Sequence, residues 1–63
     1  MFWLEIKTGG AAFCDESGGH PDPYGWEIRR ILGNVIEELK AGHQFGSIID
    51  YNGNLVGRWE YGD

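Results

Sequence analysis

The segment DYNGN at residues 50–54 places a carboxylate and two side-chain amides at alternate positions, which is how a calcium-binding EF-hand loop begins. Such a loop has glycine at its sixth position and glutamate at its twelfth, where this chain has Leu55 and Tyr61. A single carboxylate also falls far short of the roughly six to eight oxygen ligands that calcium takes. We therefore interpret the segment as a tight turn between two strands, in which Gly53 adopts a positive φ.

The soft metal ligands of the chain are Cys14, His20 and His43. Their spacing matches no zinc finger or zinc ribbon. Cys14 and His20 could form a thiol nucleophile and its base, but no third group that would orient the imidazole and no oxyanion donor accompanies them. The glycines form no phosphate-binding motif at the start of a helix. We expect no catalytic residue, no metal site and no cofactor.

The chain is acidic, with ten Asp and Glu residues against five Lys and Arg residues and a net charge of −5. Binding to DNA or RNA needs a basic face that contacts phosphates, so direct contact with nucleic acid is not expected. The acidity fits attraction to a basic protein surface, and it also fits a general role in solubility. No apolar run approaches the roughly 20 residues that cross a bilayer, so no membrane contact is expected.

The length of 63 residues predicts a single small domain, 1–63. A domain of this size buries only about 60% of its unfolded surface and is marginally stable alone. Its single cysteine permits no disulfide within the chain and indicates a reducing compartment, the cytoplasm. The first ten residues lack the basic and apolar regions of a signal peptide. With neither a metal nor a disulfide in prospect, a homodimer is expected to supply the missing burial.

Hydrophobic periodicity predicts a strand near the N-terminus and one helix. Apolar residues alternate along residues 2–7, which is the period of a half-buried strand. A long polar loop follows, and Phe13 is expected to anchor it in the core. Residues 23–41 are predicted to be a helix, with Asp22 as its N-cap, Pro23 at its first position and Gly42 as its C-terminal cap. Its apolar stripe consists of Tyr24, Ile28, Ile31, Leu32, Val35, Ile36 and Leu39.

Two more strands, at about 44–50 and 54–61, flank the DYNGN turn, and the turn decides which faces they bury. A two-residue loop at positions 52 and 53 would give the pairs Ile49–Val56 and Phe45–Glu60. A turn that begins at Asp50, with a left-handed Gly53 in its fourth position and a bulge, would give the pairs Ile49–Leu55, Ser47–Gly57 and Phe45–Trp59. We prefer the bulged turn because it separates apolar from polar residues more cleanly. Its core face would carry Phe45, Ile49, Leu55, Trp59 and Tyr61, and its other face Gly46, Ile48, Asp50, Val56, Arg58 and Glu60.

The predicted fold class is α+β, in the order β-α-β-β, with one helix packed on one face of a three-stranded antiparallel sheet. The outer sheet face would carry Trp3, Ile48 and Val56 among charged residues. Adjacent apolar residues on an outer face favour an interface with a partner or a second copy, whereas scattered ones need no explanation.

The candidate partner-binding residues are Trp26, Arg29, Arg30, Asp15, Glu16 and Trp3. Trp26 projects about 160° from the centre of the helix stripe, near Arg29 and Arg30, and Trp and Arg dominate interface hot spots. In the alternative interpretation, Trp26 folds back and covers the acidic loop that contains Asp15 and Glu16. Together with Asp22, Glu27, Glu37 and Glu38, these loop acids would give one end of the molecule a negative patch.

The stretches LEIKTGGAAF, EIRRIL and AGHQFGSIIDYNGNLVGRWEY resemble a group of short phage and prophage proteins. The resemblance covers nearly the whole chain, and its most specific part is the pattern D-x-N-G-N-x-V-G-x-W at residues 50–59. It implies a viral or prophage origin, and it assigns no activity and no functional residue.

Small, acidic phage proteins without enzymatic chemistry often act by binding a host protein. Our leading hypothesis is therefore an inhibitor of a bacterial defence system, similar to anti-CRISPR proteins, that binds a host protein stoichiometrically. The alternative is a homo-oligomeric accessory or regulatory protein of phage replication or assembly.

Overall fold

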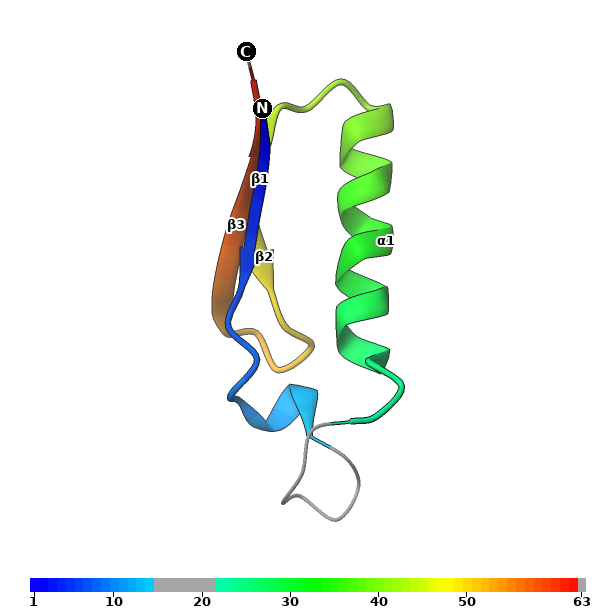
Figure 1. Cartoon of the computed structure of the whole chain (residues 1–63), viewed down its shortest axis with the longest axis vertical. Coiled ribbons are helices and arrows are strands. Elements are labelled where there is room, and N and C mark those ends of the chain that lie inside the picture. Colours follow the sequence, from blue (N-terminus) through cyan, green and yellow to red (C-terminus); the bar gives the residue numbers. More distant parts are fainter. Residues whose placement is uncertain (15–21, 63) are drawn as a thin grey trace.

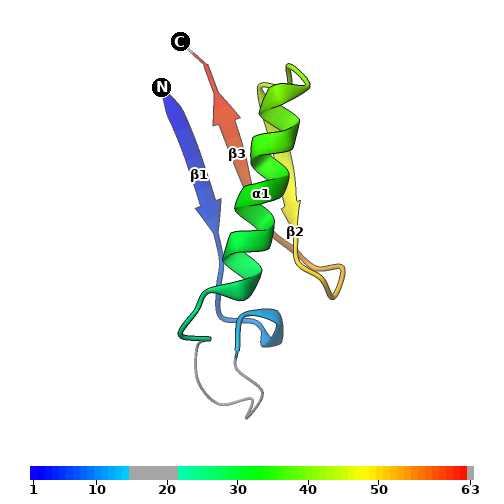
Figure 2. The same ribbon diagram turned by 90° about the vertical axis from the view of Figure 1, so that its right-hand side faces the viewer.

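The computed structural model describes residues 1–14 and 22–62, which form one helix layer and one sheet layer (Figure 1). The elements are β1 (Phe2–Ile6), the short 3-10 helix η1 (Ala11–Phe13), α1 (Trp26–Lys40), β2 (Phe45–Ile49) and β3 (Leu55–Tyr61). The strand order is β1-β3-β2 and both pairings are antiparallel. Seen from the helix side, α1 lies over β3 and β2 and leaves β1 uncovered (Figure 2). The predicted α+β fold and its β-α-β-β order are confirmed.

The helix starts three residues later than predicted. Gly25 precedes it in a left-handed conformation, with φ of 60°, so residues 23–25 do not continue the helix. Asp22 still caps the first turn from outside, because its carboxylate accepts the N–H groups of Tyr24 and Trp26, both at 3.0 Å. The predicted C-terminal cap at Gly42 is confirmed.

At that end, Gly42 has φ of 91° and its N–H donates to the Leu39 carbonyl, while the N–H of His43 donates to the Glu38 carbonyl. This pair of bonds is a Schellman motif, and it satisfies carbonyl groups that the helix end would otherwise leave without partners. The cap turns the chain directly into β2.

The DYNGN segment forms the predicted turn. The N–H of Gly53 donates to the Asp50 carbonyl at 3.0 Å, and Gly53 has φ of 86°. The Asp50 side chain also accepts the N–H groups of Asn52 and Asn54, at 3.0 and 2.9 Å. The carboxylate is therefore occupied by the backbone of its own turn, as the structural interpretation of this segment predicts.

The register beyond the turn differs from the preferred prediction. The pair Ile49–Leu55 is confirmed, but a bulge in β3 at Val56 then shifts the pairing by one residue. The observed pairs are Ile48–Gly57, Ser47–Arg58, Gly46–Trp59 and Phe45–Glu60. On its other side, the residue after the bulge approaches β1 closely, since a Cβ on Gly57 would lie 1.8 Å from the Glu5 carbonyl oxygen.

The bulge exchanges the predicted faces of β2 and of the first two residues of β3, whereas Trp59 lies in the core as predicted. Ile48 and Val56, expected outside, are buried in the core. Phe45, Ile49 and Leu55, expected inside, are exposed. The outer sheet face therefore carries these three side chains together with Trp3 and the charged residues Glu5, Arg58 and Glu60.

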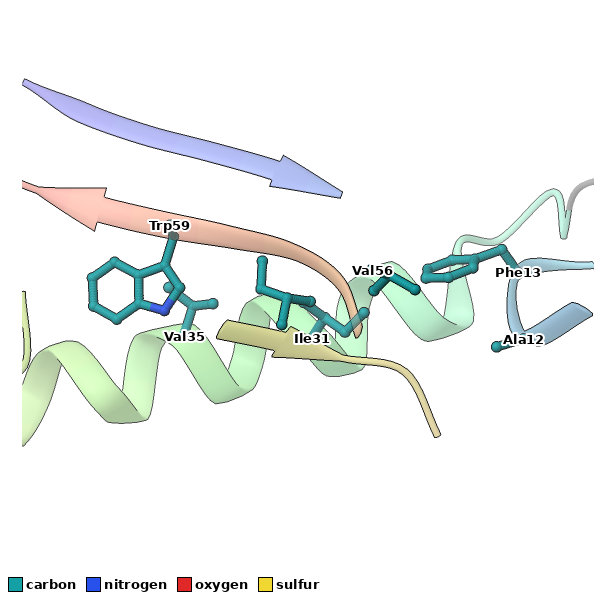
Figure 3. Close-up of a cluster of buried hydrophobic side chains, with 7 residues drawn as sticks. Ala12, Phe13, Ile31, Val35, Val56 and Trp59 are labelled. Atoms are coloured by element: carbon teal, nitrogen blue, oxygen red, sulfur yellow. The ribbon is translucent and has the colours of Figure 1, made fainter. Parts of the chain in front are cut away.

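The core lies between the sheet and α1 and consists of Ala12, Phe13, Ile31, Val35, Ile48, Val56 and Trp59. Figure 3 shows Trp59 projecting from β3 toward the helix beside Val35. Trp59 is fully buried and its indole N–H donates to Glu38 Oε2 at 3.1 Å. Phe13 is buried, so its predicted anchoring role is confirmed. Tyr24, expected in the apolar stripe, is exposed because it precedes the helix.

Candidate protein-binding surface

Trp26 and Arg29 form an exposed pair at the start of α1. The side chain of Trp26 is 67% exposed, as its position on the helix predicts. The Arg29 guanidinium carbon lies 5.3 Å from the centre of the indole ring, within cation–π range. The pair is thus held in a defined geometry on the surface, which is the arrangement expected of a contact residue.

Arg30 makes several contacts within the chain. Its guanidinium donates to both carboxylate oxygens of Glu27, at 2.6 and 2.7 Å, and to the Ile49 carbonyl at 3.2 Å. Glu27 is buried and also accepts the N–H of Tyr51 at 2.7 Å. The hydrogen bonds from Arg30 hold the pKa of Glu27 below its ordinary value of 4.5, although burial opposes this. Arg30 therefore joins the helix to the hairpin.

Trp3 is separated from the helix residues by the whole sheet. It lies on the outer face, where Arg58 of β3 sits 5.4 Å from the centre of its indole ring. Trp3 and Trp26 therefore cannot belong to one compact contact surface. Asp15 and Glu16 lie outside the described residues.

A groove of about 550 Å³ runs between α1 and β2. Its floor is formed by core residues, and its rim carries Asn34, Glu37 and Glu38 from the helix and Ser47 from the strand. The Arg30 guanidinium lines one end, but Glu27 already neutralises its charge. The groove is therefore bordered mainly by acidic and neutral polar groups, of which Glu37 pairs with the exposed Lys40 at 3.2 Å.

The strand that borders the groove is an edge strand with open backbone groups. The N–H of Tyr61 donates to the Gln44 carbonyl, so alternate residues of β2 direct their backbone groups toward β3. The N–H and C=O groups of Phe45 and Ser47 consequently point to the free edge. An extended peptide can pair with such an edge.

The sequence offered Cys14, His20 and His43 as soft metal ligands. Among residues 1–14 and 22–62, no group of three His, Cys, Asp or Glu side chains is placed to hold a metal ion. Asp50 is buried and its carboxylate serves the turn. Cys14 carries a free thiol whose sulfur lies 3.6 Å from the Gly10 carbonyl oxygen, and His20 lies outside the described residues. In the same described part of the chain, no helix is long and apolar enough to cross a membrane.

Comparison with protein-family models, with curated proteins and with solved structures found no match to this chain. Arguments about function therefore rest on the surface itself.

Sequence reasoning missed the groove and the buried Glu27. One signal was present, because Glu27, Ile31 and Val35 follow one another at intervals of four and so lie on one line of the helix. A glutamate on a buried line needs a partner, and Arg30 is its i+3 neighbour.

Proposed function

We propose that this chain is a phage-encoded, non-enzymatic protein-binding module that inhibits a bacterial defence system. It acts in the cytoplasm of the bacterial host by stoichiometric binding to a host protein, as anti-CRISPR proteins do. The observation that carries the proposal is the acid-bordered groove between α1 and β2, which lies beside an open strand edge.

The groove supports a particular binding mode. A host segment in extended conformation adds to β2 through the free backbone groups of Phe45 and Ser47. Its Lys or Arg side chains reach Glu37 and Glu38 on the helix. Proteins that hold nucleic acid present such basic segments to phosphates, so a bound acidic module would compete for them.

Trp26 extends this surface beyond the groove. It lies one turn before Arg30, whose guanidinium lines the end of the groove, so the exposed indole and the groove form one continuous surface. An aromatic anchor next to a charged groove is a common hot-spot arrangement.

Affinity capture from a bacterial lysate tests the proposal. We expect wild-type protein to retain a host protein at low salt, with a large loss at high salt. Glu37→Arg reverses one rim charge on an exposed side chain and should reduce capture about tenfold or more. Glu60→Arg is the matched control, because it makes the same charge change on the outer sheet face. Equal capture by both variants and wild type would rule out the groove as the binding site.

The second candidate function is a homo-oligomeric accessory or regulatory protein of phage replication or assembly. The exposed side chains of Phe45, Ile49 and Leu55 on the outer sheet face favour it, because this face would bury them against another copy. Sedimentation of a Phe45→Glu variant tests this candidate. Self-association of the wild-type protein that is lost in the Phe45→Glu variant would support this candidate. Sedimentation that is the same for both proteins would count against it.

A further inference from the structure

We infer that two copies of this chain pair along β1 in an antiparallel, two-fold manner, which makes one six-stranded sheet with both helices on the same face. The inference does not rest on the proposed binding of a host protein. It uses the opposite edge of the sheet from the α1–β2 groove and follows from three independent features of β1 and its surroundings.

The first feature is the direction of the backbone groups of β1. The terminal ammonium of Met1 donates to the Gly62 carbonyl, and the N–H of Gly62 donates to the Met1 carbonyl. The N–H of Lys7 donates to the Val56 carbonyl. Odd-numbered residues of β1 therefore direct their backbone groups to β3, because the bonded pairs of an antiparallel ladder alternate. The groups that point to the open edge belong to Phe2, Leu4 and Ile6.

The second feature is an apolar strip beside that edge, on the helix side of the sheet. The α1 residues that border the β2 groove include Asn34 and Glu37, so the opposite flank of the helix faces β1. That flank exposes 41% of Leu32 and 53% of Ile36. The strip consists of the exposed residues Phe2, Leu32, Ile36 and Tyr61, with Leu4 and Ile6 half-buried between them and the core.

The exposure of this strip matters because the chain is small. Phe2 and Tyr61 are 48% and 53% exposed, which together leaves on the order of 200 Å² of aromatic surface in water if each ring side chain offers about 200 Å². Figure 2 shows the cause, since the helix lies over β3 and β2 and does not cover β1. A second copy brings its own strip to the same place, and the two would cover each other.

The third feature is the register that the sequence of β1 permits. Pairing centred on Leu4 sets Leu4 opposite the partner's Leu4 and Phe2 opposite the partner's Ile6, so all the open backbone groups are used. Centring on Glu5 would place it opposite the partner's Glu5, and like charges directly opposite are destabilising. The Leu4-centred register instead places Glu5 opposite the partner's Trp3.

The edge of β2 is less suited to self-pairing. Arg30 already donates to the Ile49 carbonyl at one end of β2, and Glu37 and Glu38 border the strand. Two copies joined there would bring like charges together. Self-pairing is therefore favoured at β1 over β2.

Sedimentation equilibrium of the full chain over a wide concentration range tests the inference. Ile36→Glu places a charge in the strip and should weaken dimerisation about tenfold or more. Asn34→Glu is the matched control on the other flank of the same helix, and it should change dimerisation by less than about threefold. Far-UV circular dichroism of both variants confirms that they are folded.

A backbone variant separates hydrogen-bonded pairing of the strand edges from non-specific association through apolar side chains. Chemical synthesis can place an N-methyl group on Leu4, which removes one edge donor and keeps the side chain. We expect this protein to be monomeric at concentrations at which the N-methyl-Ser47 protein, modified on the β2 edge, still forms dimers. Wild-type protein that stays monomeric up to millimolar concentration would overturn the inference, and so would dimers that persist in both the Ile36→Glu and the N-methyl-Leu4 proteins.

Salt distinguishes this inference from the proposed function. Each copy carries a net charge of −5, so added salt screens the repulsion between copies and should strengthen the dimer. The same salt should weaken capture of a basic host segment in the groove. A dimer that dissociates as salt is raised would contradict association through the apolar strip. It would have no bearing on the test of the groove.

Discussion

Removal of the Glu27 carboxylate should destabilise the fold far more than removal of a similar carboxylate one turn from the end of the same helix. Glu27 is buried and accepts three hydrogen bonds, two from Arg30 and one from the N–H of Tyr51. Glu27→Ala leaves the partly buried Tyr51 N–H without an acceptor, at a cost of about 1–3 kcal/mol. The Arg30 side chain is 42% exposed and can be hydrated again, so its loss adds only about 0.5–1 kcal/mol.

The expected total is therefore about 2–4 kcal/mol. At roughly 0.05–0.15 kcal/mol per residue, a domain of 63 residues has an unfolding free energy of about 3–9 kcal/mol. Loss of Glu27 thus removes at least about a fifth of the unfolding free energy, and it would unfold a domain at the lower end of that range.

Urea unfolding at neutral pH, followed by the fluorescence of the buried Trp59, measures the difference. Glu37→Ala is the matched control, because Glu37 forms an i,i+3 pair with Lys40 at 3.2 Å in which both side chains are 70% exposed. That change should cost less than about 0.5 kcal/mol. Equal losses in the two variants would refute the assignment of Glu27 as the buried link between helix and hairpin.

Five further outcomes are expected from urea unfolding. Wild-type protein should lose more stability than Glu27→Gln as the pH falls below about 4.5. The pKa of Glu27 is lower in the folded protein than in the unfolded chain, so the ionised carboxylate stabilises the fold above the unfolded-state pKa. That stability is lost as the pH falls through the folded-state pKa. Gly57→Ala should abolish cooperative unfolding, since its Cβ would lie 1.8 Å from the Glu5 carbonyl oxygen. Gly33→Ala, with open space around its Cβ, should add about 0.5–1 kcal/mol. Asp50→Ala should cost about 1–2 kcal/mol, and added calcium should leave the wild-type midpoint unchanged.

The spacing of hydrophobic residues along the chain was enough to predict the order of elements. Alternation along β1, a stripe with helical period in α1 and a turn at Gly53 each follow from local chemistry. These features depend on neighbours within a few residues, so a single sequence contains them.

The faces of the hairpin were not predictable in the same way. They depend on the bulge at Val56, which shifts the pairing of β3 with β2 by one residue. Nothing in the local pattern of residues marks that position. A local rule that favours the cleanest separation of apolar and polar residues therefore chose the wrong register.

Some features of the candidate surface were predictable from the sequence. The exposure of Trp26 and its proximity to Arg29 follow from helix geometry. The role of Arg30 does not, because it requires the hairpin to place the Tyr51 N–H and the Ile49 carbonyl beside the helix. Trp3 could not be assigned to a side of the molecule until the sheet register was known.

The physical basis of the D-x-N-G-N-x-V-G-x-W pattern is now clear. Asp50 binds the turn backbone, Gly53 supplies the positive φ, and Gly57 permits the close strand approach that accompanies the Val56 bulge. Trp59 closes the core. The pattern therefore specifies a hairpin, and it assigns no chemistry to it.

The most direct test of the central claim is the binding isotherm of a host protein captured from bacterial lysate, measured by titration calorimetry against three forms of this chain. We predict a fixed stoichiometry, with affinity that falls as salt rises and falls about tenfold or more in Glu37→Arg. Glu60→Arg should bind like wild type. Binding that is equal in all three forms, or that is indifferent to salt, would contradict recognition through the acid-bordered groove.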